Sequence, residues 1–345
     1  MSGPPAAELV AEHFGLGPAT GPMVPVRHVS QETWRLDTTS GSALVKRFWE
    51  GPEVPWRADL ERAMDIERQA LDAGVDTVEP IQPPAPQFGA ATAIDGHGVF
   101  RAYPYLEHRP LEPGDEIAGW LGTTLARIHQ LQQLAETPEL SWWYGQFTPL
   151  PPERWNEWLG EGRAQNRPWA ATLADRLGLI HELGARILDV FTATGPYVLT
   201  HRDFEPWNVL MTPTGEGGGA AWRPVLIDWD VAGPDSAPLE AAHVATVFAM
   251  RGRDRPDVAL VRQTLTAYEE AGGHPVPRRP DLLVRLLGMR LSKLRQWVEV
   301  ALSPTGVESA DRADREVLDR LERLPAQVAD VSEYARVLSR SPGLG

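Results

Sequence analysis

Residues 197–232 interrupt an otherwise helical half of the chain with three short β-like runs, YVLT, NVLM and RPVLID. Apolar residues recur at helical spacing before this insert, in 115–131 and 168–192, and the stretch 236–340 is helical in pattern. A glycine-rich link at 212–222 joins two of the β-like runs. The polar motifs of the chain gather here, so the fold must hold a small β element within a helical body.

The first hundred residues are mostly β in pattern, with one helix. Short β-prone runs separated by polar or Gly/Ser stretches occupy 23–29, 33–38 and 42–48. A charged amphipathic helix is predicted over 58–73, and the dipeptide Asp-Gly at 95–96 indicates a hairpin turn. The N-terminal part of the chain therefore predicts a sheet accompanied by a helix.

The change of pattern after residue 113 predicts two lobes. A chain of 345 residues is too long for one simple core. We expect an α+β fold, with a small β-rich N-lobe at 1–107 and a larger, mainly helical C-lobe at 108–345. The connector between them is expected near 104–108.

Composition narrows the class of partner. The formal charge of −14 argues against nucleic acid or an anionic membrane as the main partner, and a cationic or neutral small substrate fits it better. The absence of cysteine excludes disulfides and thiolate metal sites and suits a cytoplasmic protein. No apolar stretch approaches the ~20 residues of a membrane span, and the first twenty residues lack a signal-peptide pattern.

The densest group of polar residues lies in the insert, in HRDFEPWN and, further on, VLIDWD. Phosphoryl transfer between oxygens requires a carboxylate that takes the acceptor proton and hard oxygen ligands that hold Mg²⁺ on the phosphates. Asp203, five residues before Asn208, supplies the first and part of the second, and Asp228 supplies the rest. A β-hairpin at 207–228 would bring Asn208 and Asp228 together. The alternative is a polar loop whose Asp and Asn only form turns.

These motifs, with Lys46 upstream, resemble the aminoglycoside phosphotransferase and choline kinase family, which has a bilobal protein-kinase-like fold. The resemblance covers residues 25–300. It implies roles for four residues of the motifs: Asp203 as catalytic base, Asn208 and Asp228 as metal ligands, and His201 as a brace of the catalytic loop.

The motifs depart from the family pattern at four positions. Arg202 replaces a usual small residue, Glu205 precedes the proline, Trp207 replaces a common glycine, and Asp230 stands where protein kinases have glycine. No catalytic group is lost. We expect Glu205, Trp207 and Asp230 to contact the acceptor. The carboxylates of Glu205, Asp230 and Asp235 would add negative charge for an amino-sugar; capping and solvated surface are the alternative.

Lysine is rare in this chain. Of the thirty-three lysine and arginine residues, only Lys46 and Lys293 are lysines. A lysine kept in so arginine-rich a chain indicates a role that a forked guanidinium cannot fill. Strand alternation puts Leu44 and Lys46 on one face. In the kinase-like fold that face covers the nucleotide, so Leu44 would cover the base and Lys46 would reach the phosphates. Glu67 is expected to orient Lys46, with Glu61 as the alternative on another face of the helix.

Other nucleotide contacts follow from the resemblance. Ser30, in the loop 29–34, is expected to lie over the phosphates with backbone amides of that loop. Tyr105 and Leu106, in the connector, are expected to read the base edge through their backbone, which leaves ATP and GTP as equal options. The glycine cluster at 215–219 precedes a strand and has no lysine after it, so a hairpin tip is expected rather than a P-loop.

Two groups of residues have a structural and a functional interpretation. His129 and Glu240 match positions of the family that support the fold, and we expect them to brace it. The tryptophans of 142–169 either pack the core or line an aromatic acceptor pocket. They are Trp142, Trp143, Trp155, Trp158 and Trp169.

The resemblance implies a small-molecule phosphotransferase that uses Mg²⁺ and moves the γ-phosphate of ATP or GTP to a hydroxyl group. An aminoglycoside-like or other antibiotic is the expected acceptor, which would mean a role in antibiotic resistance. A kinase for choline, homoserine or a sugar is the alternative. Two further classes are a nucleotide-binding pseudokinase, which usually lacks the base, the metal ligand or the lysine, and a helical scaffold.

Overall fold

The computed structural model describes residues 5–28, 32–48, 55–87, 89–138, 149–214, 221–253, 255–277, 279–303 and 310–340. The chain divides into two compact units. Unit 1 contains Met1–Ile117 and Leu199–Gly233, and unit 2 contains Ala118–Val198 and Pro234–Gly345. Unit 1 therefore combines the β-rich N-terminal segment with the polar motifs of the insert. The lobe boundary after residue 107 stays a prediction.

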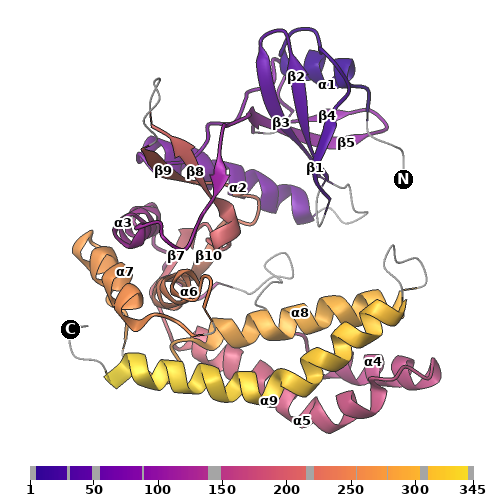
Figure 1. The fold of residues 1–345 in the computed structure, drawn as a ribbon, viewed down its shortest axis with the longest axis vertical. Helices are drawn as coiled ribbons and strands as arrows, with labels where there is room; N and C mark the ends of the chain where they lie inside the picture. The colour runs from indigo at the N-terminus through magenta and orange to yellow at the C-terminus, as the bar shows by residue number, and fades with distance from the viewer. Residues whose placement is uncertain are drawn as a thin grey trace. The chain divides into compact units, whose positions relative to one another are not determined.

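Unit 1 contains a five-stranded antiparallel sheet in the order β1-β2-β3-β5-β4 (Figure 1). Its strands are β1 (Val24–His28), β2 (Glu32–Thr38), β3 (Gly41–Phe48), β4 (Ala91–Ile94) and β5 (Gly98–Pro104). At the predicted hairpin Ile94 pairs with Gly98, and the turn residue Gly96 has a φ of 74°, which glycine adopts without strain. The predicted strands and hairpin of this segment are confirmed.

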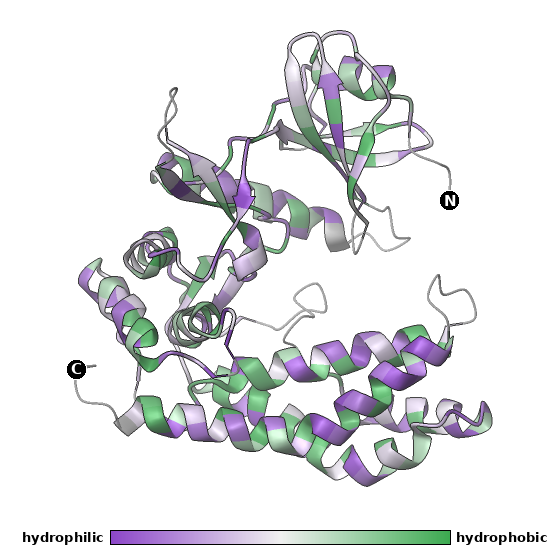
Figure 2. Ribbon diagram, viewed as in Figure 1, coloured by the Kyte–Doolittle hydropathy of each residue, from purple (hydrophilic) through white to green (hydrophobic). Residues whose placement is uncertain are grey.

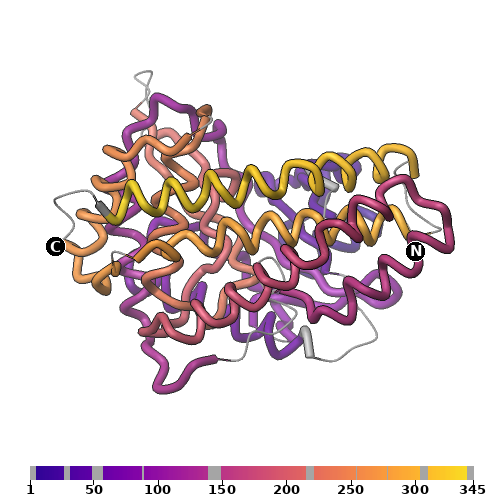
Figure 3. Tube along the Cα trace, turned by 90° about the horizontal axis from the view of Figure 1, so that it is seen from below, coloured from indigo at the N-terminus to yellow at the C-terminus, as the bar shows by residue number. Residues whose placement is uncertain are grey.

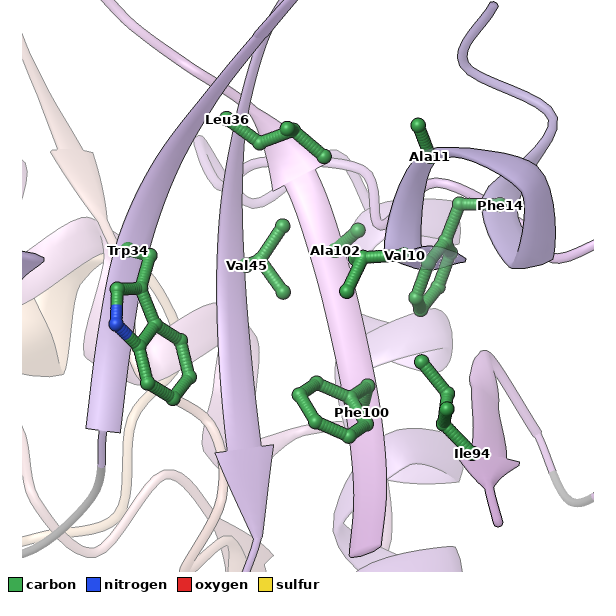
Figure 4. Close-up of a cluster of buried hydrophobic side chains, with 9 residues drawn as sticks. All are labelled: Val10, Ala11, Phe14, Trp34, Leu36, Val45, Ile94, Phe100 and Ala102. Atoms are coloured by element: carbon green, nitrogen blue, oxygen red, sulfur yellow. The ribbon is translucent and has the colours of Figure 1, made fainter. Parts of the chain in front are cut away.

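Helix α1 (Ala7–Phe14) covers one face of the sheet. Its apolar residues share one side of the helix and meet apolar residues from β2, β3, β4 and β5. Figure 4 shows the nine side chains of this core: Val10, Ala11, Phe14, Trp34, Leu36, Val45, Ile94, Phe100 and Ala102. No helix was expected here, because eight residues give too short an apolar period to identify one.

The opposite face of the sheet carries polar side chains. Val45 lies in the core on the α1 side, so Leu44 and Lys46 lie on the other side, as predicted. In the β3–β5 register, Lys46 is opposite Arg101 and Leu44 is opposite Tyr103. The sheet therefore brings the Lys46 ammonium and the Arg101 guanidinium to one face.

The polar insert forms the predicted hairpin. Strand β8 (Val209–Pro213) pairs antiparallel with β9 (Trp222–Leu226), and β6 (Arg109–Pro110) pairs with the other edge of β8. Val209 and Leu226 form the pair of the hairpin that lies farthest from its turn. Residues 207–228 are thereby folded back on themselves.

A short segment after helix α2 (Pro55–Asp72) joins this hairpin to the five-stranded sheet. Thr77 forms a bridge with Leu226, and its hydroxyl donates to the Leu226 carbonyl at 2.7 Å. Four residues on, Ile81 forms a bridge with Ala102 of β5. The two sheets of unit 1 are thus connected by backbone pairing as well as by the chain itself.

Unit 2 is mainly helical. Its helices are α3 (Ala118–His129), α4 (Pro152–Ala164), α5 (Ala170–Thr192), α6 (Ala237–Ala249), α7 (Val258–Glu270), α8 (Val284–Leu302) and α9 (Ala310–Arg340). The short strands β7 (Tyr197–Thr200) and β10 (Gly233–Ser236), each of which has residues in both units, pair with each other. Figures 1 and 3 show α8 and α9 side by side. The helical pattern predicted for 115–131, 168–192 and 236–340 is confirmed.

Burial in these helices follows the apolar spacing of the sequence. In α3, Leu121, Leu125 and Ile128 are buried, and α9 shows hydrophilic and hydrophobic residues in alternation along its length (Figure 2). Helix α6 is buried on almost every side, and the Ser236 side chain caps it by accepting from the backbone N–H of Leu239. Within the described ranges, no helix combines the length and apolar character that crossing a membrane requires.

Candidate active site

The loop between β7 and β8 is held by His201, which is fully buried. Its Nε2 donates to the Ile227 carbonyl at 3.0 Å, and its Nδ1 accepts from the Asp203 backbone N–H at 3.3 Å. The ring also packs edge-on against Trp229, with centroids 4.6 Å apart. These two hydrogen bonds select one tautomer and hold the loop against the end of β9, which supports the predicted bracing role.

Asp203 and Asn208 are in direct contact. The Asn208 amide nitrogen donates to Oδ2 and to the backbone carbonyl of Asp203, both at 2.8 Å. The 3₁₀ turn Pro206–Asn208 brings the two residues together. The second carboxylate oxygen, Asp203 Oδ1, is buried and has no hydrogen-bond partner in the described part of the chain. Burial of such an oxygen is costly, so it is the atom most suited to receive a proton from a substrate.

Asp228 follows β9 in a backbone conformation that residues other than glycine rarely adopt, with a φ of 71°. The preceding Ile227 N–H donates to the Asn208 carbonyl at 2.9 Å, so the hairpin places Asp228 beside Asn208 although the two are twenty positions apart. Arg202, next to Asp203, also has a positive φ of 67°. Strained backbone of this kind persists where the surrounding structure fixes it, and it is common at functional sites.

Lys46 lies between two carboxylates. Its Nζ is 2.6 Å from Asp228 Oδ1 and also contacts Asp230 Oδ2. The side chain is buried. Burial acts to lower the pKa of Lys46, but the charges of Asp228 and Asp230 outweigh it, so the pKa is raised and the ammonium stays charged.

Arg101 extends these ion pairs across the sheet. Its Nη1 lies 3.3 Å from Asp230 Oδ1, and its Nη2 contacts Glu67 Oε2. Glu67 also accepts from the Tyr103 hydroxyl at 3.1 Å. Arg101, Glu67 and Asp230 are all at most 2% exposed. Five charged side chains therefore form one continuous network, of which all but the half-buried Asp228 are buried: Glu67, Arg101, Asp230, Lys46 and Asp228.

The structure gives Glu67 a different partner from the predicted one. Glu67 was expected to orient Lys46, but it binds Arg101 and Tyr103 instead. Arg101 is the cross-strand neighbour of Lys46, and its forked guanidinium can bind two carboxylates at once. The alternative, Glu61, is exposed on α2.

The two carboxylates of the predicted site differ in their electrostatics. Burial, together with the charges of Asp228 and Glu205, raises the pKa of Asp203 to about 7. Burial acts in the same direction on Asp228, but the Lys46 ammonium outweighs it and holds the pKa of Asp228 below its ordinary value. A carboxylate that titrates near neutral pH suits a general base, and one that stays ionised suits a metal ligand.

The donor set fits a Mg²⁺ ion shared with phosphates. Both N–H groups of the Asn208 amide are used on Asp203, which leaves the amide oxygen as a ligand atom. The Asp228 side chain is 32% exposed and stays ionised. Among the described residues there is no group of three or more His, Cys, Asp or Glu that could hold a metal. Mg²⁺ commonly binds one or two carboxylates together with substrate phosphates, so a sparse set of this kind suits it.

Of the three residues expected to contact the acceptor, Trp207 alone has an exposed side chain, at 49%. Glu205 is buried. Asp230 is buried as well, and both of its oxygens are bound, one by Lys46 and one by Arg101. This placement corrects the expectation for Asp230, because a side chain with both oxygens occupied inside the network cannot meet an acceptor.

The predicted nucleotide contacts lie along β3 and after β5. Leu44 is half-buried on the same face as Lys46. The Tyr105 backbone N–H donates to the Ser42 carbonyl at 2.9 Å, and Leu106 follows it directly. Ser30 lies outside the described residues, so its predicted contact with the phosphates stays a prediction.

In unit 2, His129 of α3 binds two residues of neighbouring helices. Its Nε2 is 2.9 Å from Glu240 Oε2 in α6, and its Nδ1 is 2.8 Å from the Tyr268 hydroxyl in α7. Both His129 and Glu240 are buried. These contacts tie α3, α6 and α7 together, which supports the predicted bracing role.

Three of the five tryptophans pack inside unit 2. Trp155, Trp158 and Trp169 are buried, which favours the core interpretation for them. Trp142 and Trp143 lie outside the described residues, as does the glycine cluster at 215–219.

Arg101 is the member of the network that the sequence analysis did not identify. An arginine between Phe100 and Ala102, inside an apolar strand, is itself a signal, because a charge at a buried position must be paired. Its partners could not be named, since they lie 34 and 129 positions away.

Comparison with known proteins gives the family and the fold of the chain. Residues 23–274 match the model of the phosphotransferase enzyme family, APH. No curated protein matches the sequence. Spectinomycin phosphotransferase, solved with ADP and spectinomycin, is 15% identical with a TM-score of 0.61, covering 97% of this chain and 98% of that chain.

Two further solved structures share the fold. Amicoumacin kinase, solved with AMP-PNP, Ca²⁺ and amicoumacin, is 11% identical with a TM-score of 0.62, covering 92% of this chain and 91% of that chain. A choline/ethanolamine kinase family protein from Mesorhizobium loti is 14% identical with a TM-score of 0.53, covering 92% and 93%. These likenesses confirm the predicted protein-kinase-like fold with a β-sheet lobe and a helical lobe. Since the family model spans most of the chain and includes every residue of the network, this protein belongs to the phosphotransferase enzyme family.

Proposed function

We propose that this protein is a small-molecule kinase that transfers the γ-phosphoryl group of ATP or GTP to a hydroxyl group of its acceptor. The observation that carries the proposal is the state of Asp203. Its carboxylate is buried, its pKa is raised to about 7, Asn208 holds one oxygen, and the other oxygen has no partner in the described chain. A carboxylate in this state is suited to accept a proton from a hydroxyl near neutral pH.

Each charged group has a distinct part in the proposed reaction. Asp203 Oδ1 takes the hydroxyl proton while the acceptor oxygen bonds to the γ-phosphorus and the bond from that phosphorus to the nucleoside diphosphate breaks. Lys46 binds the phosphates of the nucleotide. Asn208 and Asp228 would hold Mg²⁺, which when bound neutralises charge on the phosphates. The protein thus acts by positioning and by charge neutralisation.

Leu44, Tyr105 and Leu106 are proposed to surround the nucleotide base. Leu44 supports this by lying two residues from Lys46 on the same strand face, half-buried. Tyr105 and Leu106 follow β5 directly; the Tyr105 N–H is used on Ser42 and the Leu106 carbonyl on His108, so the Tyr105 carbonyl and the Leu106 N–H are the groups proposed to pair with a base edge. Backbone pairing leaves both ATP and GTP as co-substrates.

We propose a hydroxylated antibiotic as the acceptor, which would give the protein a role in resistance. Two proteins of the same fold are solved with spectinomycin and with amicoumacin. The exposed Trp207, next to Asn208 in the 3₁₀ turn, offers an aromatic surface to such a molecule, and the charge of −14 suits a cationic one. The likeness to a choline/ethanolamine kinase family protein favours a small amino alcohol as the second candidate. The lack of cysteine fits action in the cytoplasm.

The test is a nucleotide-consumption screen with Mg²⁺ and either ATP or GTP. The panel contains aminoglycoside and other hydroxylated antibiotics, amino alcohols, homoserine and sugars. For each acceptor that is consumed, Asp203→Asn should lower turnover by ~10²–10⁴ while calorimetry shows that nucleotide binding survives. Unchanged turnover in this variant would remove Asp203 from the role of base.

A further inference from the structure

The carboxylate that fixes Lys46 is not in helix α2. Lys46 Nζ contacts Oδ2 of Asp230, whose other oxygen, Oδ1, is 3.3 Å from Arg101 Nη1. Glu67 of α2 meets the same guanidinium at Nη2. Asp230 therefore divides its two oxygens between two cations, and Arg101 divides its two terminal nitrogens between two carboxylates.

We propose that Asp230, held in place by Arg101, is the positioning residue that sets Lys46 for the nucleotide phosphates, in place of Glu67. This inference rests on the proposed function, in which Lys46 binds those phosphates. Arg101 is also a positioning residue, but an indirect one, since it acts on Lys46 through Asp230.

Asp230 suits this role better than the other carboxylate on Lys46. Asp228 is the proposed metal ligand, and its side chain is 32% exposed, whereas that of Asp230 is almost fully buried. A carboxylate engaged by Mg²⁺ has less charge left for an ammonium. Asp230 can stay with Lys46 throughout, because its Oδ2 contacts Lys46, its Oδ1 contacts Arg101, and no metal role is proposed for it.

Arg101 is what allows a buried carboxylate at this position. A buried charge must be compensated by an opposite charge. Arg101 lies on β5, directly opposite Lys46 of β3, and its guanidinium supplies that charge to the buried Asp230. Its fork binds Glu67 and Asp230 in fixed directions, which a single ammonium could not do. Glu67 of helix α2 therefore acts on Lys46 through Arg101 and Asp230.

The chain offers a matched pair of variants for the test. Asp230→Asn and Glu67→Gln are both isosteric, both lie in the buried network, and both remove one carboxylate from Arg101. Only Asp230 also contacts Lys46. A difference between these variants at Lys46 therefore reports the Asp230 contact and not the loss of a charge beside Arg101.

Lysine acylation gives a readout that needs no turnover. Lys46 and Lys293 are the only lysines, and Lys293 is exposed, so it serves as an internal reference in each sample. The free protein is treated with an amine-acylating ester at one pH, and peptide mass spectrometry gives the ratio of the two rates. Melting temperatures confirm that each variant is folded.

We expect Asp230→Asn to raise acylation of Lys46 relative to Lys293 by about threefold or more, because an ammonium held by two carboxylates loses one of them. Glu67→Gln should leave the ratio within about twofold. With nucleotide and acceptor, Asp230→Asn should raise the KM for the nucleotide about tenfold and leave the acceptor KM unchanged. An unchanged ratio in Asp230→Asn, or an equal rise in Glu67→Gln, would overturn the inference.

Asp230→Glu covers the case in which Asp230→Asn does not fold. It keeps the charge but moves the carboxylate by one methylene, so Lys46 should stay protected while the nucleotide KM rises. Acylation of Lys46 as fast as Lys293 in this variant would overturn the inference. If labelling follows the expected pattern but no acceptor is phosphorylated, the proposed function fails and the Lys46–Asp230 contact stands.

Discussion

The properties of Asp203 come from its immediate surroundings. Burial raises its pKa to about 7, the nearby charges of Asp228 and Glu205 add to this, and the hydrogen bond from Asn208 opposes it. Asp228 carries the same side chain but lies against Lys46, which lowers its pKa. Two aspartates on neighbouring segments are thereby prepared for different chemistry.

The raised pKa of Asp203 predicts how activity depends on pH. The base must be ionised, so kcat/KM should be constant above about pH 7 and should fall tenfold per unit as the pH drops below it. A pH series of kcat/KM for the nucleotide measures this in the free enzyme. A profile that is flat down to pH 5 would contradict the assignment of Asp203 as base.

Stability should change in the opposite direction over the same window. The folded pKa of Asp203 is about 7 and the ordinary value is 3.8, so between them the folded state binds more protons than the unfolded state. This contribution is fully present below pH 3.8 and is lost as the pH rises through 7. Melting curves of Asp203→Asn supply the control, because its residue 203 does not titrate.

Strand β3 serves two purposes with successive residues. Its alternation sends Val45 into the core beneath α1 and sends Leu44 and Lys46 to the face with the charged network. A strand is well suited to this task, because neighbouring residues are rigidly linked yet point to opposite faces. The packing of Val45 in the core thus fixes the positions of Leu44 and Lys46 on the opposite face of the sheet.

Adjacent alanine variants of β3 should separate stability from nucleotide binding. Val45→Ala should cost about 2 kcal/mol in the free energy of unfolding, because two methyl groups leave a filled core. Leu44→Ala should change stability less and should raise the nucleotide KM. Denaturant unfolding and steady-state kinetics measure the two effects. Equal stability losses with an unaltered nucleotide KM would mean that Leu44 does not cover the base.

In the molecule as a whole, the residues proposed to bind the nucleotide and to take part in the reaction lie in unit 1. The network, the loop 201–208 and the β-hairpin all lie in Met1–Ile117 and Leu199–Gly233, while unit 2 has its own helical core. The middle part of the chain therefore returns to the sheet formed by its beginning. A nucleotide bound by these groups would contact residues from both segments of unit 1, Met1–Ile117 and Leu199–Gly233.

Binding of a Mg²⁺-nucleotide should stabilise the folded chain. At a nucleotide concentration a hundred times Kd, the expected gain is about 2.7 kcal/mol, seen as a higher melting temperature. Chelation of Mg²⁺ should remove most of the gain, and Asp228→Ala should reduce it. No stabilisation by either ATP or GTP would favour a helical scaffold protein. Stabilisation without transfer to any acceptor would favour a nucleotide-binding pseudokinase.

Much of this arrangement could be predicted from local patterns. The alternation of β3, the helical spacing of α3 and the turn at Gly96 depend on residues a few positions apart, and the motif around Asp203 carried the family resemblance. Helix α1 could not be predicted because its apolar period is too short. The partner of Glu67 could not be predicted because no residue near Glu67 in the sequence indicates Arg101.

The amino-acid sequence was enough to determine the two lobe types and the family, and to propose residues for the base, the metal ligands and the ammonium, since each is encoded in short segments. The pairing of Lys46 with Asp230, the position of Arg101 between Glu67 and Asp230, and the raised pKa of Asp203 arose only on folding. Ion pairing and desolvation depend on distance through space, and Lys46 and Asp230 stand 184 positions apart along the chain.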